Sequence, residues 1–201
     1  MYMATPARTA AAIILGYLAG TFPTADLVAR VATGGRIDPR SDGSGNPGAV
    51  NTMQTVGAGW GYGVLAVDVT KGAVAAAVGS RLAGSTGANL AGAAAVVGHC
   101  YPVWSGGRGG KGVAASIGQV LVTFPVYFPI DAAVAGLTAA SPRWKRRAFT
   151  ATAAASATWV AASVLWWRKG WSTGWGPKPT AALPVAAAIS SAVIAARFAR
   201  S

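Results

Sequence analysis

Glycine, amide and cationic residues recur in three short polar stretches of an otherwise apolar chain. The stretches read SGNPGAVN at residues 44–51, DVTKG at 68–72 and GGRGGKG at 106–112, and the only histidine, His99, lies between the second and the third. Backbone amides, amide side chains and fixed cations are groups that bind phosphate oxygens. We therefore expect the three stretches and His99 to form an anion site, most simply for a phosphate.

The first stretch offers both hydrogen-bonding groups and a flexible backbone. Ser44, Asn46 and Asn51 carry hydroxyl and amide groups suited to phosphate oxygens. Gly45 and Gly48 permit tight turns and close approach to a ligand. A helix that follows the stretch could direct its N-terminus at an anion. The same composition is also typical of a turn without a ligand, and both interpretations stay open.

Asp68 and Lys71 lie three residues apart, so they share one helix face and can pair. Ionisable residues inside an apolar span are usually functional, although a structural ion pair between helices is the alternative. His99 ends the next apolar run. It is a candidate for orienting a phosphate or a hydroxyl, or for acid–base chemistry, and the alternative is a histidine with a structural role.

The third stretch combines two cations with a run of glycines. Arg108 could bind a phosphate in a bidentate manner, and Lys111 could add a point charge. A nucleotide-binding P-loop does not fit, because Ser105 occupies the first glycine position and a glycine follows Lys111 where Ser or Thr is needed. The stretch therefore argues against an ATPase and favours a basic, glycine-rich binding loop.

Composition indicates a membrane protein. Hydrophobic residues make up 53% of the 201 residues, charged residues only 11%, and the mean hydropathy is +0.43; soluble domains carry about 25% charged residues. The net charge is +12, and the bases lie mainly at the ends of apolar runs, which favours contact with anionic lipids over nucleic-acid binding. One histidine and one cysteine do not suffice for a conventional zinc cluster, and we expect neither a metal nor a cofactor.

Apolar runs of about 20 residues predict helices that cross a bilayer. We expect spans near residues 10–29, 60–82, 87–103, 149–167 and 180–196, and loops at 32–55, 104–112 and 141–147. Residues 113–140 are interrupted by Pro125 and Pro129, so we expect two short helices that turn back there. The sequence thus predicts an all-α membrane protein, a compact bundle of about seven transmembrane helices in a single domain over residues 1–201.

Charge indicates the orientation of this bundle. With seven helices, eleven basic residues fall on one side and five on the other, Lys71 being inside the membrane. The richer side is predicted to be cytoplasmic, which leaves the N-terminus outside. This arrangement also gathers the loops at 32–55, 104–112 and 141–147 on one face, whereas a six-helix alternative would separate the last from the others.

The order of the stretches resembles a known family. GSGNPGAxN at residues 43–51, DxxKG at 68–72 and GHxxPxxxxxRGGKGVA at 98–114 are similar to the bacterial PlsY family of acyl-phosphate-dependent glycerol-3-phosphate acyltransferases. The resemblance runs from about residue 10 to 150 and implies an enzyme of phospholipid biosynthesis in the bacterial inner membrane. Such an enzyme transfers a fatty acyl group from acyl phosphate to the sn-1 hydroxyl of glycerol 3-phosphate, giving lysophosphatidic acid and phosphate. The partners implied are these two substrates and membrane lipids, and we expect a monomer.

Roles follow from the resemblance, motif by motif. Catalytic roles would fall to Ser44, Asn46, His99 and Thr150; phosphate binding to Arg40, Asn51, Lys71, Arg108 and Lys111; and backbone shape to Gly45, Gly48, Gly109 and Gly110. Because the acyl donor is already a mixed anhydride, no covalent enzyme nucleophile is needed. Positioning of two phosphates and stabilisation of the developing oxyanion would then carry catalysis.

The chain departs from the family pattern in four places. Gln54 stands where the family usually has arginine, and Asp26 is unexpected in the first span. Residues 147–153 read RAFTATA in place of R-Y-V-S-x-x-S, so Thr150 replaces the first serine and the second is absent. Residues 195–201 lack a His- and Asn-containing RHRxNIxR-like stretch. The alternative prediction is therefore a divergent or inactive relative that binds phospholipids or phosphate esters, or uses another acceptor.

Overall fold

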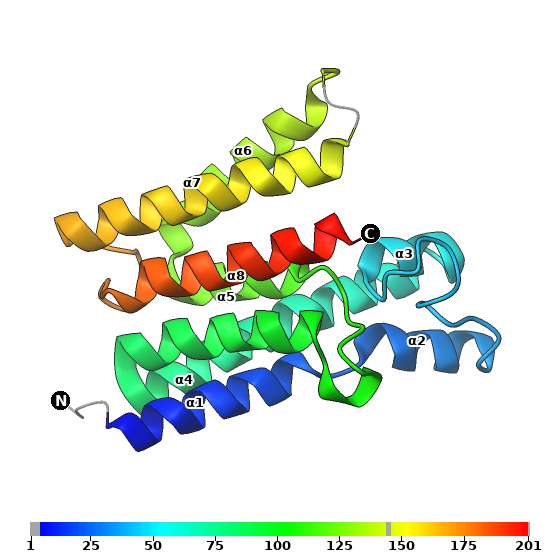
Figure 1. Cartoon of the computed structure of the whole chain (residues 1–201), viewed down its shortest axis with the longest axis horizontal. Coiled ribbons are helices and arrows are strands. Elements are labelled where there is room, and N and C mark those ends of the chain that lie inside the picture. Colours follow the sequence, from blue (N-terminus) through cyan, green and yellow to red (C-terminus); the bar gives the residue numbers. More distant parts are fainter. Residues whose placement is uncertain (1–4, 144–145, 201) are drawn as a thin grey trace.

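The computed structural model describes residues 5–143 and 146–200, and every regular element in them is helical. The helices are α1 (Pro6–Gly20), α2 (Thr24–Thr33), α3 (Ala49–Thr55), α4 (Ala58–Cys100), α5 (Val113–Thr123), α6 (Phe128–Ala140), α7 (Arg147–Lys169) and α8 (Ala182–Ala199). Short 3₁₀ turns lie at Val103–Ser105 and Pro125–Tyr127. The long helices pack side by side in one elongated bundle, with α6 and α7 along one edge and α1 along the other (Figure 1).

Helix α4 consists of two arms that fold back on each other. The break falls at Ala83 and Gly84, whose φ/ψ angles are −142°/29° and 57°/−146°. Gly84 lies in the left-handed region that glycine adopts without strain. The arms then approach so closely that a methyl group at Gly79 would overlap the backbone of Gly87. The expected helices at 60–82 and 87–103 are therefore confirmed as the two arms of a hairpin.

Small residues allow the helices to pack with their backbones in contact. Gly16 and Gly20 of α1 lie against the carbonyl groups of Ala91 and Ala95 in the second arm of α4. Gly118 of α5 lies in the same manner against the first arm. This close packing fixes the height of each polar residue on α4 relative to its neighbours on α1 and α5.

Several helices are long and apolar enough to cross a membrane. Pro6–Thr33, Ala58–Ser105, Arg147–Lys169 and Ala182–Ala199 meet that description, and Val113–Thr123 with Pro125–Ala140 forms a further pair bent by 120°. Within the described residues, α1, the two arms of α4 and the helices α5 to α8 make seven helical segments. Successive segments run in alternating directions along the bundle (Figure 1). The helical membrane fold is thus confirmed, and the number and sidedness of the spans stay predictions.

The expected first span at 10–29 lies within Pro6–Thr33, and a break at Thr21–Pro23 divides it between α1 and α2. One detail of the sequence prediction was wrong. The expected loop at 32–55 ends in a helix, because Ala49–Thr55 form α3. The loop before α3, the glycine-rich loop before α5, the start of α7 and the end of α8 all lie at one end of the bundle, with the start of α1 at the other (Figure 1).

Candidate anion-binding site

A cavity of about 360 Å³ opens at the loop-rich end, where α1, α2, α4 and the glycine-rich loop meet. Its chemically active lining residues are Asp26, Arg40, Asp68, Lys71, His99, Gly109 and Gly110. Two cations, two carboxylates and an imidazole thus share one cavity. The structure brings together Arg40, Lys71, His99 and the two glycines, five of the residues that the sequence assigned to the site.

A buried polar cluster forms the inner wall of this cavity. The Asp68 carboxylate lies 3.0 Å from the Lys71 ammonium and 3.8 Å from Nδ1 of His99, and it accepts a hydrogen bond of 2.9 Å from the Thr24 hydroxyl. Lys71 also donates to the carbonyl of Phe22 at 3.2 Å. Asp68, Lys71 and His99 are all less than a tenth exposed. The predicted pairing of Asp68 with Lys71 is confirmed, and it offsets two charges that would be costly to bury alone.

The glycine-rich loop returns to the histidine. The Gly109 and Gly110 amides each donate 3.1 Å hydrogen bonds, to the carbonyls of Cys100 and His99 respectively. A methyl group at Gly110 would overlap the His99 imidazole and lie 3.0 Å from the carbonyl oxygen of Pro47. The first polar stretch, the histidine and the glycine-rich loop therefore meet at Gly110.

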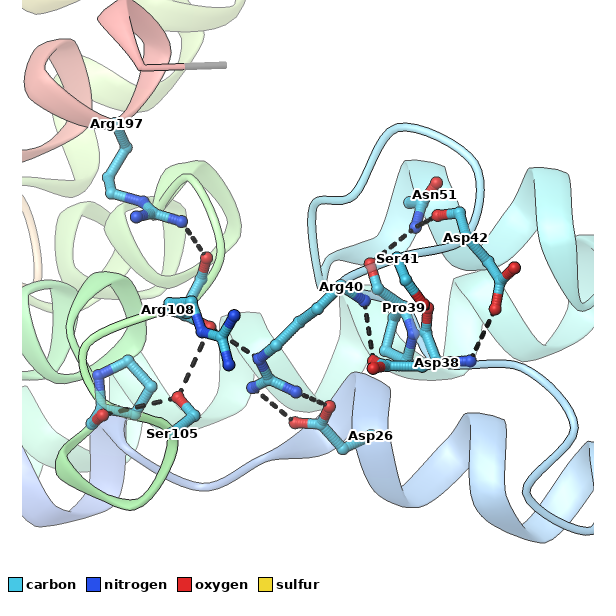
Figure 2. A network of polar contacts seen from close by, with 12 residues as sticks. Asp26, Asp38, Pro39, Arg40, Ser41, Asp42, Asn51, Ser105, Arg108 and Arg197 are labelled. Carbon is cyan, nitrogen blue, oxygen red and sulfur yellow. Dashed lines mark hydrogen bonds and ion pairs between the residues drawn. The ribbon is translucent and has the colours of Figure 1, made fainter.

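Arg197 near the end of α8 fastens this loop from the other side. Its Nε donates a 3.2 Å hydrogen bond to the carbonyl of Gly110. Its Nη2 donates to the carbonyl of Gly109 (Figure 2). The sequence identified Arg197 only as a basic residue at the end of a span. No local pattern pointed to this role, because the bonded residues lie 87 and 88 positions away.

The two cations of the glycine-rich loop lie beside the cavity, not in its lining. Lys111 places its ammonium 4.4 Å from the centre of the Phe198 ring. Burial, followed by the charge of nearby Arg197, lowers the pKa of Lys111 below the usual lysine range. Arg108 has an exposed side chain, and its carbonyl accepts a 2.8 Å hydrogen bond from Nε of Arg40 (Figure 2). Arg108 thus supports the loop through its backbone.

Asn51 holds the first polar stretch together. Both hydrogens of its amide are donated, to the carbonyls of Pro39 at 3.1 Å and Asp42 at 3.0 Å (Figure 2). Its oxygen accepts from the amide and the hydroxyl of Ser44 at 2.8 and 3.1 Å. The side chain of Asn51 is buried and fully engaged, so its geometry fits a loop-fastening role instead of the expected direct contact with phosphate.

Other expected residues lie away from the cavity lining. Ser44 is exposed and Asn46 half-buried on the loop before α3. Gly45 has a φ of +67°, which explains the glycine there, whereas Gly48 is extended and precedes the first residue of α3. Thr150 donates its hydroxyl to the carbonyl of Arg146 in the first turn of α7. The structure does not bring these groups to the cationic wall of the cavity.

The fold and this cavity define a multi-pass membrane protein with a cationic site at one end. The family model described as glycerol-3-phosphate acyltransferase matches residues 10–200. Two crystal structures of PlsY (YgiH), an integral membrane glycerol 3-phosphate acyltransferase, are similar to the chain over most of its length. The lysophosphatidic acid form has a TM-score of 0.73 at 26% identity, covering 96% of this chain and 88% of that one. The glycerol 3-phosphate form has a TM-score of 0.72 at 27% identity, covering 94% and 89%.

Curated relatives with the same name are more similar over a shorter stretch. The glycerol-3-phosphate acyltransferase of Exiguobacterium sibiricum is 49% identical over 116 residues, 58% of this chain and 55% of the relative. That of Symbiobacterium thermophilum is 40% identical over 131 residues, 65% of this chain and 64% of the relative. The chain therefore spans less than two thirds of these relatives in the matched regions. From the match over residues 10–200, the chain belongs to the glycerol-3-phosphate acyltransferase family.

Proposed function

We propose that the protein transfers a fatty acyl group from acyl phosphate to the sn-1 hydroxyl of glycerol 3-phosphate, giving lysophosphatidic acid and phosphate. The observation that carries this proposal is the meeting of the three polar stretches at one cavity, with His99 and Gly110 at their junction. Further support comes from the two PlsY structures, which are a glycerol 3-phosphate form and a lysophosphatidic acid form.

The chemistry of this reaction suits a site that positions anions. The acceptor hydroxyl attacks the acyl carbonyl carbon, the bond from that carbon to the phosphate oxygen breaks, and phosphate leaves. The leaving phosphate takes up the proton that the hydroxyl loses. Arg40 and Lys71 supply positive charge in the cavity, and His99 orients the hydroxyl or the phosphate. We also propose catalytic roles for Ser44, Asn46 and Thr150 and phosphate binding for Lys111, all four of which lie outside the lining of the cavity.

The proposal extends to the location of the protein. The cavity opens at the end of the bundle that holds the glycine-rich loop and the basic start of α7, and that end is proposed to face the cytoplasm. The protein then acts as a monomeric, multi-pass enzyme of the bacterial inner membrane, with a water-soluble acceptor entering from the cytoplasm.

Phosphate release tests the proposed reaction directly. Purified protein in detergent or lipid would be given palmitoyl phosphate with and without glycerol 3-phosphate. Release that depends on glycerol 3-phosphate, together with lysophosphatidic acid, would support the proposal. Release without an acceptor would indicate a hydrolase or another acceptor. Binding without any turnover would favour the divergent relative, for which Gln54 in place of an arginine is the motivating observation.

Lys111→Ala and Asn46→Ala should each lower kcat/KM by about tenfold, because each substitution removes one charge-assisted or well-placed hydrogen bond. Both residues lie on loops, where a truncated side chain leaves the helices intact, so folding should persist. Lys111→Ala also removes the contact with the Phe198 ring of α8, and the unfolding measurement shows what that contact contributes. Steady-state rates and a thermal unfolding curve would be measured for each variant. Lys178→Ala is the control, because Lys178 lies before α8 at the opposite end of the bundle. Unchanged rates in both variants would refute the role of these loops.

The pH dependence of the rate should report on Lys111. A lysine keeps its charge only below its pKa, and the pKa of Lys111 is lowered, so its charge is lost at a lower pH than that of an ordinary lysine. We expect kcat/KM to begin its alkaline decline before the usual lysine range is reached. Lys111→Arg should move that decline to higher pH, because arginine stays protonated. Identical alkaline limbs in the two proteins would exclude Lys111 as the titrating group.

A further inference from the structure

The carboxylate of Asp26, on α2, points into the cavity and binds the guanidinium of Arg40. Both carboxylate oxygens take part: Nη1 of Arg40 donates to one, and Nη2 donates to the other at 3.0 Å (Figure 2). The side chains of Asp26 and Arg40 are 28% and 19% exposed, so the pair remains reachable from the cavity. Such two-pronged contacts fix the orientation of a guanidinium as well as its position.

Arg40 also connects its own loop, which precedes α3, to the glycine-rich loop. Its Nε donates a 2.8 Å hydrogen bond to the carbonyl of Arg108 in the glycine-rich loop, and its own amide donates 2.9 Å to the Asp38 carboxylate. Arginine has five N–H groups, and three of those of Arg40 are engaged by described residues. The other two lie on opposite edges of the planar guanidinium, so one of them at a time can face a ligand oxygen in the cavity.

The second ion pair of the cavity differs in exposure. Asp68 and Lys71 are only 2% and 8% exposed and are packed among Thr24, Phe22 and His99. The chain has five acidic residues in all, and two of them, Asp26 and Asp68, line this one cavity. An acidic side chain in a site for anions requires an explanation, and for Asp26 the explanation is its two-pronged contact with Arg40.

We propose that Asp26 is a positioning residue that holds Arg40 on the cavity wall, with an N–H group of Arg40 available to a phosphate ester. Through Arg40 it also ties the glycine-rich loop to α2. The inference rests on the proposed function for the identity of the ligand, but the contact itself requires only an anion with phosphate-like oxygens. Without Asp26, the Arg40 side chain would have to be ordered again each time a ligand binds.

Asp26→Asn tests this inference because it keeps the size of the side chain and removes its charge and one acceptor. The dissociation constant of inorganic phosphate, measured by calorimetry, should rise about fivefold, the usual effect of ordering one long side chain on binding. The KM for glycerol 3-phosphate should rise by a similar factor with a smaller change in kcat. Asp26→Glu should recover part of the affinity. Asp131→Asn, which removes a carboxylate from α6 outside this cavity, is the matched control.

A double-mutant comparison separates positioning from a general structural role. In an Arg40→Gln background, Asp26→Asn should cause no further loss of phosphate affinity, because Asp26 is proposed to act only through Arg40. Equal, additive losses in both backgrounds would overturn the inference. So would tighter phosphate binding by Asp26→Asn, which would identify Asp26 as a competing counter-ion. The inference would also fail if Asp26→Asn were partly unfolded at the temperature of the binding measurement and this unfolding explained the weaker binding.

The same measurements keep this inference apart from the proposed reaction. If the wild-type protein binds phosphate but transfers no acyl group, the proposed function fails, and weaker phosphate binding by Asp26→Asn would still support the positioning role. If acyl transfer is found but Asp26→Asn changes neither KM nor phosphate affinity, the positioning role fails alone. A wild-type protein that neither binds phosphate nor turns over would overturn both.

Discussion

Gly110→Ala is expected to lower acyl transfer by about 100-fold, the effect that a misplacement of about 1 Å can have on catalysis. The added methyl group would overlap the His99 imidazole and lie 3.0 Å from the carbonyl oxygen of Pro47. Neither neighbour can withdraw easily. His99 is 7% exposed and packed against Asp68, and Pro47 is buried in the loop before α3. The substitution must therefore push the glycine-rich loop away from the cavity.

The control for this result is alanine at a glycine with free space. Gly63 lies within α4, and a methyl group there would meet no atom within 4 Å. Alanine in place of a helical glycine is neutral or stabilising by about 0.5–1 kcal/mol. We expect Gly63→Ala to retain full activity. Initial rates and unfolding temperatures would be compared, and a Gly110→Ala protein with normal folding and normal rates would show that the junction tolerates movement.

Local patterns predicted the parts of the site that depend on neighbours in sequence. Asp68 and Lys71 share a helix face by their spacing, and a break between the two arms of α4 follows from the limited length of a span. The proline at position 125 likewise marks the bend between α5 and α6. In each case a property of a few adjacent residues fixes the structure.

Contacts made by tertiary packing were not predictable in this way. The bond between Asp26 and Arg40 joins α2 to the following loop, and that of Arg197 joins α8 to a loop almost 90 residues earlier. Both depend on how the helices are aligned, which glycine and alanine contacts determine. Asn51 shows a second limit, because an amide suited to phosphate is equally suited to the backbone carbonyls of Pro39 and Asp42. Residue type alone does not say which partner an amide takes.

Lys71→Met is expected to destabilise the folded protein by about 3–5 kcal/mol, the usual effect of removing one partner of a buried ion pair. Asp68 is only 2% exposed, and without the ammonium its carboxylate would retain the Thr24 hydroxyl and the imidazole of His99 as neighbours. Methionine has a similar length and fills the space, so lost charge compensation, not a cavity, would be responsible. Thermal unfolding in the same detergent or lipid would measure the effect.

The double variant Asp68→Asn, Lys71→Met separates stability from activity. Removing both charges leaves no uncompensated ion in the protein interior, so most of the lost stability should return. Acyl transfer should not return, because Lys71 lines the cavity and supplies positive charge to the substrate phosphate in the proposed reaction. A stable and fully active double variant would show that the pair only holds helices together. If Lys71→Met were as stable as the wild type, Thr24 and His99 would be sufficient to stabilise the Asp68 carboxylate. The role of Lys71 would then be judged only from the acyl-transfer rate of Lys71→Met.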